Sequence, residues 1–360
     1  MANLGVSSDF WRKRRVFVTG DTGFKGAWLS LWLKHLGAQF VGFALGPPTV
    51  PSLYERAAIG SLIEHIHGDV RDRSAVATAM AAAEPDVVFH LAAQPLVRES
   101  YLAPVETYAT NVMGTVHVLE AARAARNKGR SGPQAVVIIT SDKCYEEKNL
   151  SGDYVETDAM GGHDPYSSSK GCAELVAAAY RRSFADAGIG IATARAGNVF
   201  GGGDWAKDRL IPDAIRAFVA NEPLVLRHPK AVRPFQHVLE PLTGYLLLAE
   251  SLYKNGEDFA EAWNFGPDPG GETAEHVVAV LADCLGTSCI WSIDEGASPR
   301  ESERLKLDSS KARARLSWRP QLALQHALKL TADWHRWEAA HPCQSMLDFT
   351  LAQIRDYADS

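Results

Sequence analysis

The chain has 360 residues, of which 46% are apolar and 22% are charged, an ordinary balance for a globular protein. Its net charge of −6 argues against nucleic acid as a partner, because phosphate backbones are bound by basic surfaces. No apolar run approaches 18 residues and no signal peptide is recognisable, so we expect no membrane contact and a cytoplasmic location. The five cysteines lack paired metal spacing and the histidines form no ligand set, so no metal site is predicted.

Strand and helix patterns alternate through the first half of the chain. Apolar strand patterns occur at 15–20, 39–45, 62–70, 86–93, 135–140 and 188–200. Helical patterns lie between them at 26–37, 72–83, 104–126 and 166–187. This alternation predicts the α/β class, with a Rossmann-type doubly wound parallel sheet covered by helices on both faces.

The alternation breaks after residue 200, where shorter strand patterns and scattered helices begin. We therefore divide the chain into a first domain, residues 1–200, and a smaller α/β lobe for the substrate, residues 201–360. The helical stretch 239–254 is expected to pack back on the first domain, so that the two parts interleave.

The stretch TGDTGFKG places Gly20, Gly23 and Gly26 between the first strand and an amphipathic helix. Glycine is needed where the backbone turns sharply and where a pyrophosphate approaches main-chain N–H groups at a helix N-terminus. A glycine triplet alone could be an incidental turn, but the strand before it and the helix after it favour nucleotide binding.

Tyr166 and Lys170 are four residues apart in a predicted helix and so share one face. A nearby ammonium stabilises a phenolate, so we expect Lys170 to lower the pKa of Tyr166 and to let it act as a base. The alternative is an ordinary solvated pair on a helix surface.

The residues Ser141, Asp142 and Lys143 follow an apolar strand, at the edge where open α/β sheets bind their ligands. They could form a solvated turn. They could also supply an acid and a base for catalysis.

Together, these motifs resemble the extended short-chain dehydrogenase/reductase family. The glycine spacing after Thr19, the GDV of 68–70, the LAAQ of 91–94 and the YSSSK of 166–170 carry the resemblance. It implies NAD as cofactor, held by Gly20, Gly23, Phe24, Lys25, Gly26, Asp69, Val70, Leu91, Ala92, Ala93, Tyr166 and Lys170. The family often has an acid at the end of the second strand, where it holds the ribose hydroxyls of NAD. Residues 42–45 hold no acid, so this position alone does not distinguish NAD from NADP. They hold no arginine either, and we therefore prefer NAD.

In this family a residue at the position of Ser141 helps the tyrosine to polarise a substrate hydroxyl. Asp142 and Lys143 go beyond what a reductase or epimerase needs, and the layout resembles the nucleotide-sugar 4,6-dehydratases, with Asp142 as acid and Lys143 as base. Members acting on dTDP-glucose usually carry Thr-Asp-Glu here, so Glu146 and Glu147 remain alternative bases. Three alternatives remain: a dehydratase for another nucleotide sugar, a nucleotide-sugar 4-epimerase, and an NAD-binding protein without activity.

The resemblance also implies substrate-binding residues and an assembly. The substrate residues that it implies are Gln94, Asn198, Arg209, Arg227, Arg233, His237 and Arg304. Arginine suits this site because its guanidinium fork matches phosphate oxygens bidentately. The partner expected is a small nucleotide sugar that serves deoxysugar synthesis. The chain is expected to form a homodimer or homotetramer through a four-helix bundle of the helices 104–126 and 166–187.

Overall fold

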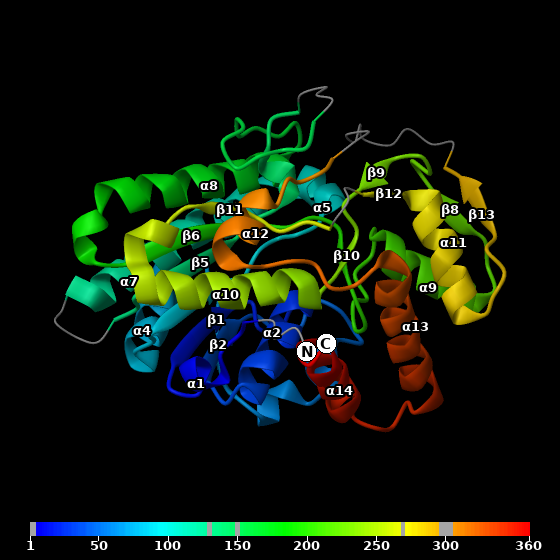
Figure 1. Cartoon of the computed structure of the whole chain (residues 1–360), viewed down its shortest axis with the longest axis horizontal. Coiled ribbons are helices and arrows are strands. Elements are labelled where there is room, and N and C mark those ends of the chain that lie inside the picture. Colours follow the sequence, from blue (N-terminus) through cyan, green and yellow to red (C-terminus); the bar gives the residue numbers. More distant parts are fainter. Residues whose placement is uncertain (1–4, 128–131, 148–151, 268–270, 295–304) are drawn as a thin grey trace.

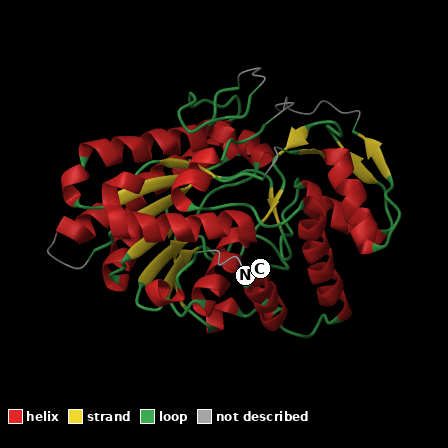
Figure 2. Ribbon diagram, in the orientation of Figure 1, coloured by secondary structure: helices red, strands yellow, loops and turns green. Residues whose placement is uncertain are grey.

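The computed structural model describes residues 5–127, 132–147, 152–267, 271–294 and 305–360. Seven strands form one sheet in the order β11-β6-β5-β4-β1-β2-β3, and all neighbouring strands run parallel (Figures 1 and 2). The Rossmann-type sheet predicted from the alternation of patterns is confirmed. Its strands are β1 (Arg15–Thr19), β2 (Gln39–Ala44), β3 (Glu64–His67), β4 (Val87–His90), β5 (Ala135–Ile139), β6 (Gly190–Arg195) and β11 (Ala262–Asn264).

Helices cover both faces of this sheet because successive strand residues point to opposite sides. Val16 and Val18 of β1 pack in one buried cluster with Trp28, whereas Phe17 between them packs in another with Met80. The helices around the sheet are α1 (Ser8–Trp11), α2 (Phe24–His35), α3 (Leu53–Arg56), α4 (Arg73–Ala83), α5 (Val97–Leu102), α6 (Pro104–Tyr108), α7 (Gly114–Asn127), α8 (Pro165–Ser183), α10 (Leu239–Asn255), α12 (Ser310–Leu316) and α14 (Leu347–Ala358).

The smaller lobe lies beside the sheet, at the right of Figure 1. It has its own apolar cluster, to which α9, α11 and α13 contribute. Its helices are α9 (Leu210–Ala220), α11 (Ala274–Leu285) and α13 (Leu324–Ala340), and its short strands are β8 (Leu224–Leu226), β9 (Val232–Arg233), β12 (Glu272–Thr273) and β13 (Trp291–Ile293). The strands β7 (Val199–Phe200) and β10 (Gln236–His237) pair where the chain passes between the two parts.

Several segments that follow residue 200 contact the sheet or the helices around it, among them the stretch 239–254 that was expected to pack back. Helix α10 contacts β5 and β6, β11 extends the sheet beside β6, and α14 contacts α2. Most residues of α10 are buried, including Leu242, Leu246 and Leu252, so this helix belongs to the core. These parts of 201–360 therefore pack with the first domain.

The helix predicted at 104–126 is present but interrupted. Between α6 and α7 the backbone forms a π-helical turn, η2 (Ala109–Met113), a feature that often accompanies functional sites. Within this turn the Asn111 side chain donates hydrogen bonds to the carbonyl of Gln94 (3.0 Å) and to Ser169 Oγ (2.8 Å). It thereby ties the loop after β4 to α8. In the part of the chain that is described, no helix is both long enough and apolar enough to span a bilayer.

Candidate active site

A cavity of about 340 Å³ opens at the carboxyl ends of β4, β5 and β6, between the sheet and the smaller lobe. Leu91 lines it after β4, Ser141 after β5 and Asn198 after β6, while Leu226 of β8 lines it from the lobe. The carboxyl ends of parallel strands meet at one edge, where open α/β sheets bind ligands. The cavity is thus where the fold places chemistry.

The loop between β1 and α2 can adopt its tight backbone path only because of its glycines. Gly20 has a φ of +78°, and a Cβ there would lie 2.6 Å from the backbone nitrogen of Ala92. A Cβ on Gly26 would lie 2.0 Å from the carbonyl oxygen of Gly20. Gly23 is the N-cap of α2 without a side-chain cap from the described residues, so the first N–H groups of the helix remain available to an anion.

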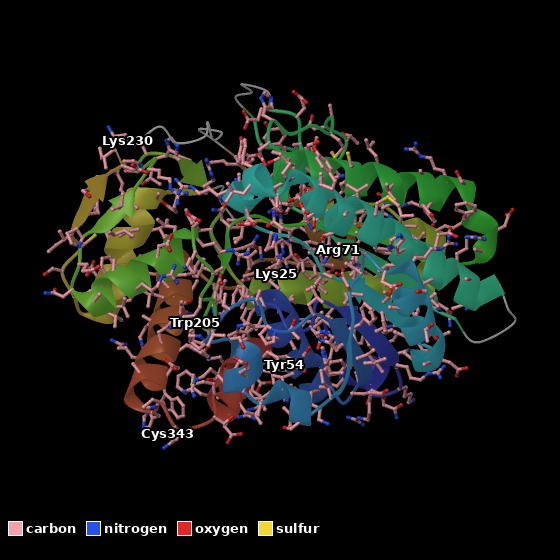
Figure 3. The ribbon with its side chains drawn as sticks, turned by 180° about the vertical axis from the view of Figure 1, so that it is seen from behind. Lys25, Tyr54, Arg71, Trp205, Lys230 and Cys343 are labelled. Carbon is pink, nitrogen blue, oxygen red and sulfur yellow. The ribbon has the colours of Figure 1, made fainter. Side chains whose placement is uncertain are left out.

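This loop lies at the point where the strand order reverses, since β1 has β4 on one side and β2 on the other. Dinucleotides bind across that point, so the loop geometry fits NAD. Phe24, Lys25, Leu91 and Ala93 line the cavity beside it. Figure 3 shows Lys25 near the centre of the molecule, and burial lowers the pKa of its ammonium to about 7.

The residues after β3 lie farther along the same edge. Arg71 donates two hydrogen bonds to the Asp69 carboxylate, at 2.8 and 2.6 Å, and Val70 is buried against Gly114. Asp21 of the glycine loop packs against β2, but it is fully buried and 2.8 Å from His65 Nδ1. A carboxylate in that position cannot replace the acid that is missing from the end of β2.

Tyr166 and Lys170 lie on the first turns of α8 and both line the cavity. The Lys170 ammonium donates a hydrogen bond to the carbonyl of Ile139 (3.2 Å), and burial lowers its pKa to about 8. Burial raises the pKa of Tyr166 to about 12, which a hydrogen bond with Ser141 only partly offsets. The prediction that Lys170 lowers the pKa of Tyr166 is therefore wrong in this structure, because desolvation of the phenolate outweighs any favourable charge.

Ser141, Asp142 and Lys143 do not form a solvated turn. Ser141 Oγ donates to Asp142 Oδ1 (2.9 Å) and accepts a hydrogen bond from the backbone nitrogen of Lys143 (3.2 Å), which fixes a short 3-10 turn. Asp142 is only 2% exposed, and its Oδ2 has no hydrogen-bond partner among the described residues. Burial raises its pKa, against Lys143 and Arg233, which lower it. A carboxyl group whose pKa is raised in this way is better suited to donate a proton than a solvated one.

Four of the predicted substrate residues line the cavity together: Asn198, Arg209, Arg227 and Arg233. Arg209 is held by Asp204 at 2.9 Å, and Arg233 is 6% exposed and donates to the carbonyl of Val232. In a chain of net charge −6 these arginines form a local positive site that suits an anionic ligand. Arg304 lies outside the described residues.

Gln94 and His237 are not among the residues that line the cavity. The amide of Gln94 donates to Leu96 O and Thr107 Oγ1, and its oxygen accepts from the Leu96 nitrogen, so the side chain shapes the loop after β4. His237 is fully buried between Trp28 and Phe200, and desolvation lowers its pKa to about 3. Both expectations of substrate contact differ from the placement in the structure.

A buried ion pair beneath the cavity was missed by the sequence analysis. Glu174 and Arg195 are 4% and 3% exposed and form two parallel hydrogen bonds of 2.9 and 2.8 Å. Thr140, directly before Ser141, also donates to Glu174. Glu174 lies eight residues after Tyr166 on the same helix, so helical spacing could have indicated that it faces the same way. The pair fixes α8 against the ends of β5 and β6.

Arg98 of α5 and Asp208 were also missed, and both line the cavity. Arg98 follows the loop after β4 by a few residues, which is the signal that could have found it. Asp208 lies directly before the predicted Arg209, in a segment that joins the two parts of the molecule.

Comparison with known proteins places these features in a family context. A family model described as the NAD dependent epimerase/dehydratase family matches residues 16–266. The CDP-glucose 4,6-dehydratase of Salmonella typhimurium is 49% identical over 360 residues, with 98% of each chain covered. The dTDP-glucose 4,6-dehydratase of Streptomyces antibioticus is 27% identical, with 89% of this chain and 92% of that protein covered.

Solved structures have the same fold. A UDP-glucose 4-epimerase of Thermus thermophilus in complex with NAD has a TM-score of 0.76 at 25% identity, covering 89% of this chain and 99% of that one. A dTDP-glucose 4,6-dehydratase of Streptomyces venezuelae, solved with NAD bound, has a TM-score of 0.76 at 24% identity, covering 92% and 99%.

Proposed function

The chain belongs to the NAD dependent epimerase/dehydratase family, and we propose that it converts CDP-D-glucose to CDP-4-keto-6-deoxy-D-glucose by an NAD-dependent 4,6-dehydration. The observation that carries the reaction type is the position of Asp142 and Lys143 in one cavity with Ser141 and Tyr166. A 4-epimerase needs only the hydroxyl groups and a hydride acceptor, whereas loss of water also needs an acid and a base. The choice of nucleotide rests on the 49% identity to the Salmonella enzyme.

Each side chain has one task in this scheme. When bound at the glycine loop, NAD supplies a hydride acceptor whose reduced form can return the hydride to the same substrate. Tyr166, with Ser141, takes the proton from the sugar 4-hydroxyl, so that a ketone forms at carbon 4. Lys143 removes the carbon-5 proton that the ketone acidifies, and Asp142 protonates the 6-hydroxyl so that it leaves as water. Carbon 6 then takes back the hydride and carbon 5 takes back a proton, which gives the 4-keto-6-deoxy sugar.

The protonation states support this division of roles. Burial raises the pKa of Asp142, which brings its protonated form within easier reach and suits a proton donor. A positioned general acid contributes about 10²–10⁴-fold to a rate, and hydroxide is a poor leaving group without one. Tyr166 must lose a proton to act, and positive charge near it favours that loss. Arg209, which lines the same cavity, provides part of that charge.

The diphosphate of the substrate is proposed to bind the arginines of the cavity. Arg209 and Arg233 lie in the cavity wall next to Asn198, and Arg227 approaches from the smaller lobe. Guanidinium forks bind phosphate oxygens in pairs, which fixes the orientation of the sugar relative to Tyr166.

We also propose that two copies of the chain pair through the helices predicted at 104–126 and 166–187, which are α6, α7 and α8, and both α6 and α7 contact α8. Large apolar side chains are exposed on the elements 97–113 and on α8: Leu102 is 81% exposed, Val105 74% and Leu175 60%. Because α5, α6 and α8 contact one another, these apolar side chains lie on neighbouring elements, and a second copy that presents the same helices would bury them in a four-helix bundle. Light scattering of Leu102→Glu/Val105→Glu should show a smaller particle than the unchanged chain, and an unchanged particle would contradict the pairing.

Mass spectrometry of products tests the main proposal. The protein and NAD are mixed separately with CDP-glucose, UDP-glucose, dTDP-glucose and UDP-N-acetylglucosamine. We expect loss of one water from CDP-glucose with no net formation of NADH. Loss of water only from another sugar would keep the reaction and change the nucleotide. An isomer of unchanged mass would mean epimerisation, and the acid and base roles of Asp142 and Lys143 would be refuted.

A further inference from the structure

Two arginines on opposite sides of the cavity share one carboxylate oxygen. Arg98 belongs to α5 on the side of the sheet, and Arg227 follows β8 in the smaller lobe. Nη1 of Arg98 lies 3.3 Å and Nη2 of Arg227 lies 2.5 Å from the same Oδ1 of Asp208. All three side chains line the cavity and are between 24% and 41% exposed. The ion bridge therefore crosses the cavity at a level that water reaches.

This bridge occupies the groups that an anionic substrate needs. Asp208 neutralises charge on both guanidinium groups, yet ion pairs as exposed as these are weak, because water and salt screen them. A diphosphate carries more charge than one carboxylate and offers several oxygens for bidentate bonding. Asp208 and a bound diphosphate thus compete for the same two arginines.

We propose that Asp208 holds Arg98 and Arg227 in place across the cavity and yields them to the diphosphate of the nucleotide sugar. Arg98 is then a substrate-binding residue, and Asp208 weakens the binding of substrate and product alike. This inference rests on the proposed function, because it takes a nucleoside diphosphate as the ligand. Its consequence is faster release of product, at the cost of some affinity.

The chain offers a matched control in Asp213. Its carboxylate also lines the cavity, so its removal changes the charge of the lining by the same amount. Asp213, however, pairs with Arg216, and Arg216 is not among the residues that line the cavity. Asp213→Asn therefore shows the effect of removing one negative charge from the cavity lining. Asp208→Asn removes the same charge and also frees two arginines.

Titration calorimetry with CDP and with inorganic pyrophosphate measures the effect. We expect Asp208→Asn to bind CDP about 2–5-fold more tightly than the unchanged chain, since exposed ion pairs are worth this much. The gain should shrink at high salt and should appear with pyrophosphate as well. Arg98→Gln should weaken both ligands by roughly the same factor, and Asp213→Asn should change the Kd by less than about twofold.

Asp208 has a φ of +62°, so Asp208→Gly is a second variant that removes the carboxylate and suits the backbone. Unchanged or weaker CDP binding by both Asp208 variants would overturn the inference. An equal gain in Asp213→Asn would overturn it too, as would a gain with CDP that pyrophosphate does not share. If the unchanged chain binds pyrophosphate but not CDP, the proposed nucleotide fails, and the pyrophosphate series alone decides the role of Asp208.

Discussion

Gly197 leaves space for the carboxyl group of the proposed catalytic acid, Asp142, because it has no side chain. We expect a methyl group at position 197 to displace that carboxyl group. A Cβ added to Gly197 would lie 1.7 Å from Asp142 Oδ2 and 2.2 Å from its Cγ. Real Cβ atoms do not approach this closely, so in Gly197→Ala the carboxyl group must rotate away. The backbone around residue 197 need not move, because the atoms in conflict are the end of one side chain.

The size of the effect follows from the role of Asp142. Loss of a positioned general acid slows the step that it serves by about 10²–10⁴-fold, or ~3–5 kcal/mol in the barrier. Overpacking costs about 1–3 kcal/mol of stability, so the variant should still fold. Oxidation at carbon 4 depends on Tyr166, whereas the three atoms nearest to the added methyl group all belong to Asp142, so this step should be kept.

Stopped-flow absorbance of the reduced nicotinamide, with mass spectrometry of quenched product, separates the two steps. Gly197→Ala should reduce the cofactor and then stall before loss of water, as Asp142→Asn should. The double variant should be no slower than either single one, because both remove the same group. Gly46→Ala is the control, since its Cβ would meet no atom within 4 Å. Loss of water at the wild-type rate in Gly197→Ala would refute the reasoning. An equal slowing of cofactor reduction and of water loss would refute it as well.

Three further outcomes are expected. Tyr166→Phe should abolish reduction of the cofactor in single-turnover absorbance, and normal reduction would remove Tyr166 as the base. Lys143→Ala should stop exchange of the carbon-5 proton with deuterated water by NMR, and normal exchange would move the base to Glu146 or Glu147. Burial raises the pKa of Glu240 to about 7 from its ordinary 4.5. The folded state therefore keeps a proton that the unfolded chain releases, so stability from this group is full below about pH 4.5 and is lost as the pH rises through 7. Glu240→Gln should remove this fall of ~3 kcal/mol in urea unfolding at several pH values, and an unchanged slope would contradict it.

Several features of the site could be predicted because they depend on residues close together in the sequence. The glycine spacing after β1 and the four-residue spacing of Tyr166 and Lys170 are local, and each has one backbone geometry that suits it. The parallel sheet follows from the alternation of strand and helix, since parallel neighbours need a crossover between them. Ser141 to Lys143 were located by the same logic, at the end of a buried strand.

Other features could be decided only by the tertiary structure, because they join residues far apart in the chain. Burial raises the pKa of both Asp142 and Tyr166, which spacing alone does not reveal. Gly197 reaches Asp142 only because the ends of β5 and β6 lie side by side in the sheet. The bridge of Arg98, Asp208 and Arg227 forms only because the smaller lobe packs beside the sheet. Local sequence patterns thus determined the class of fold and most of the chemical groups, whereas long-range packing decided their charge states, their partners and which of them face the cavity.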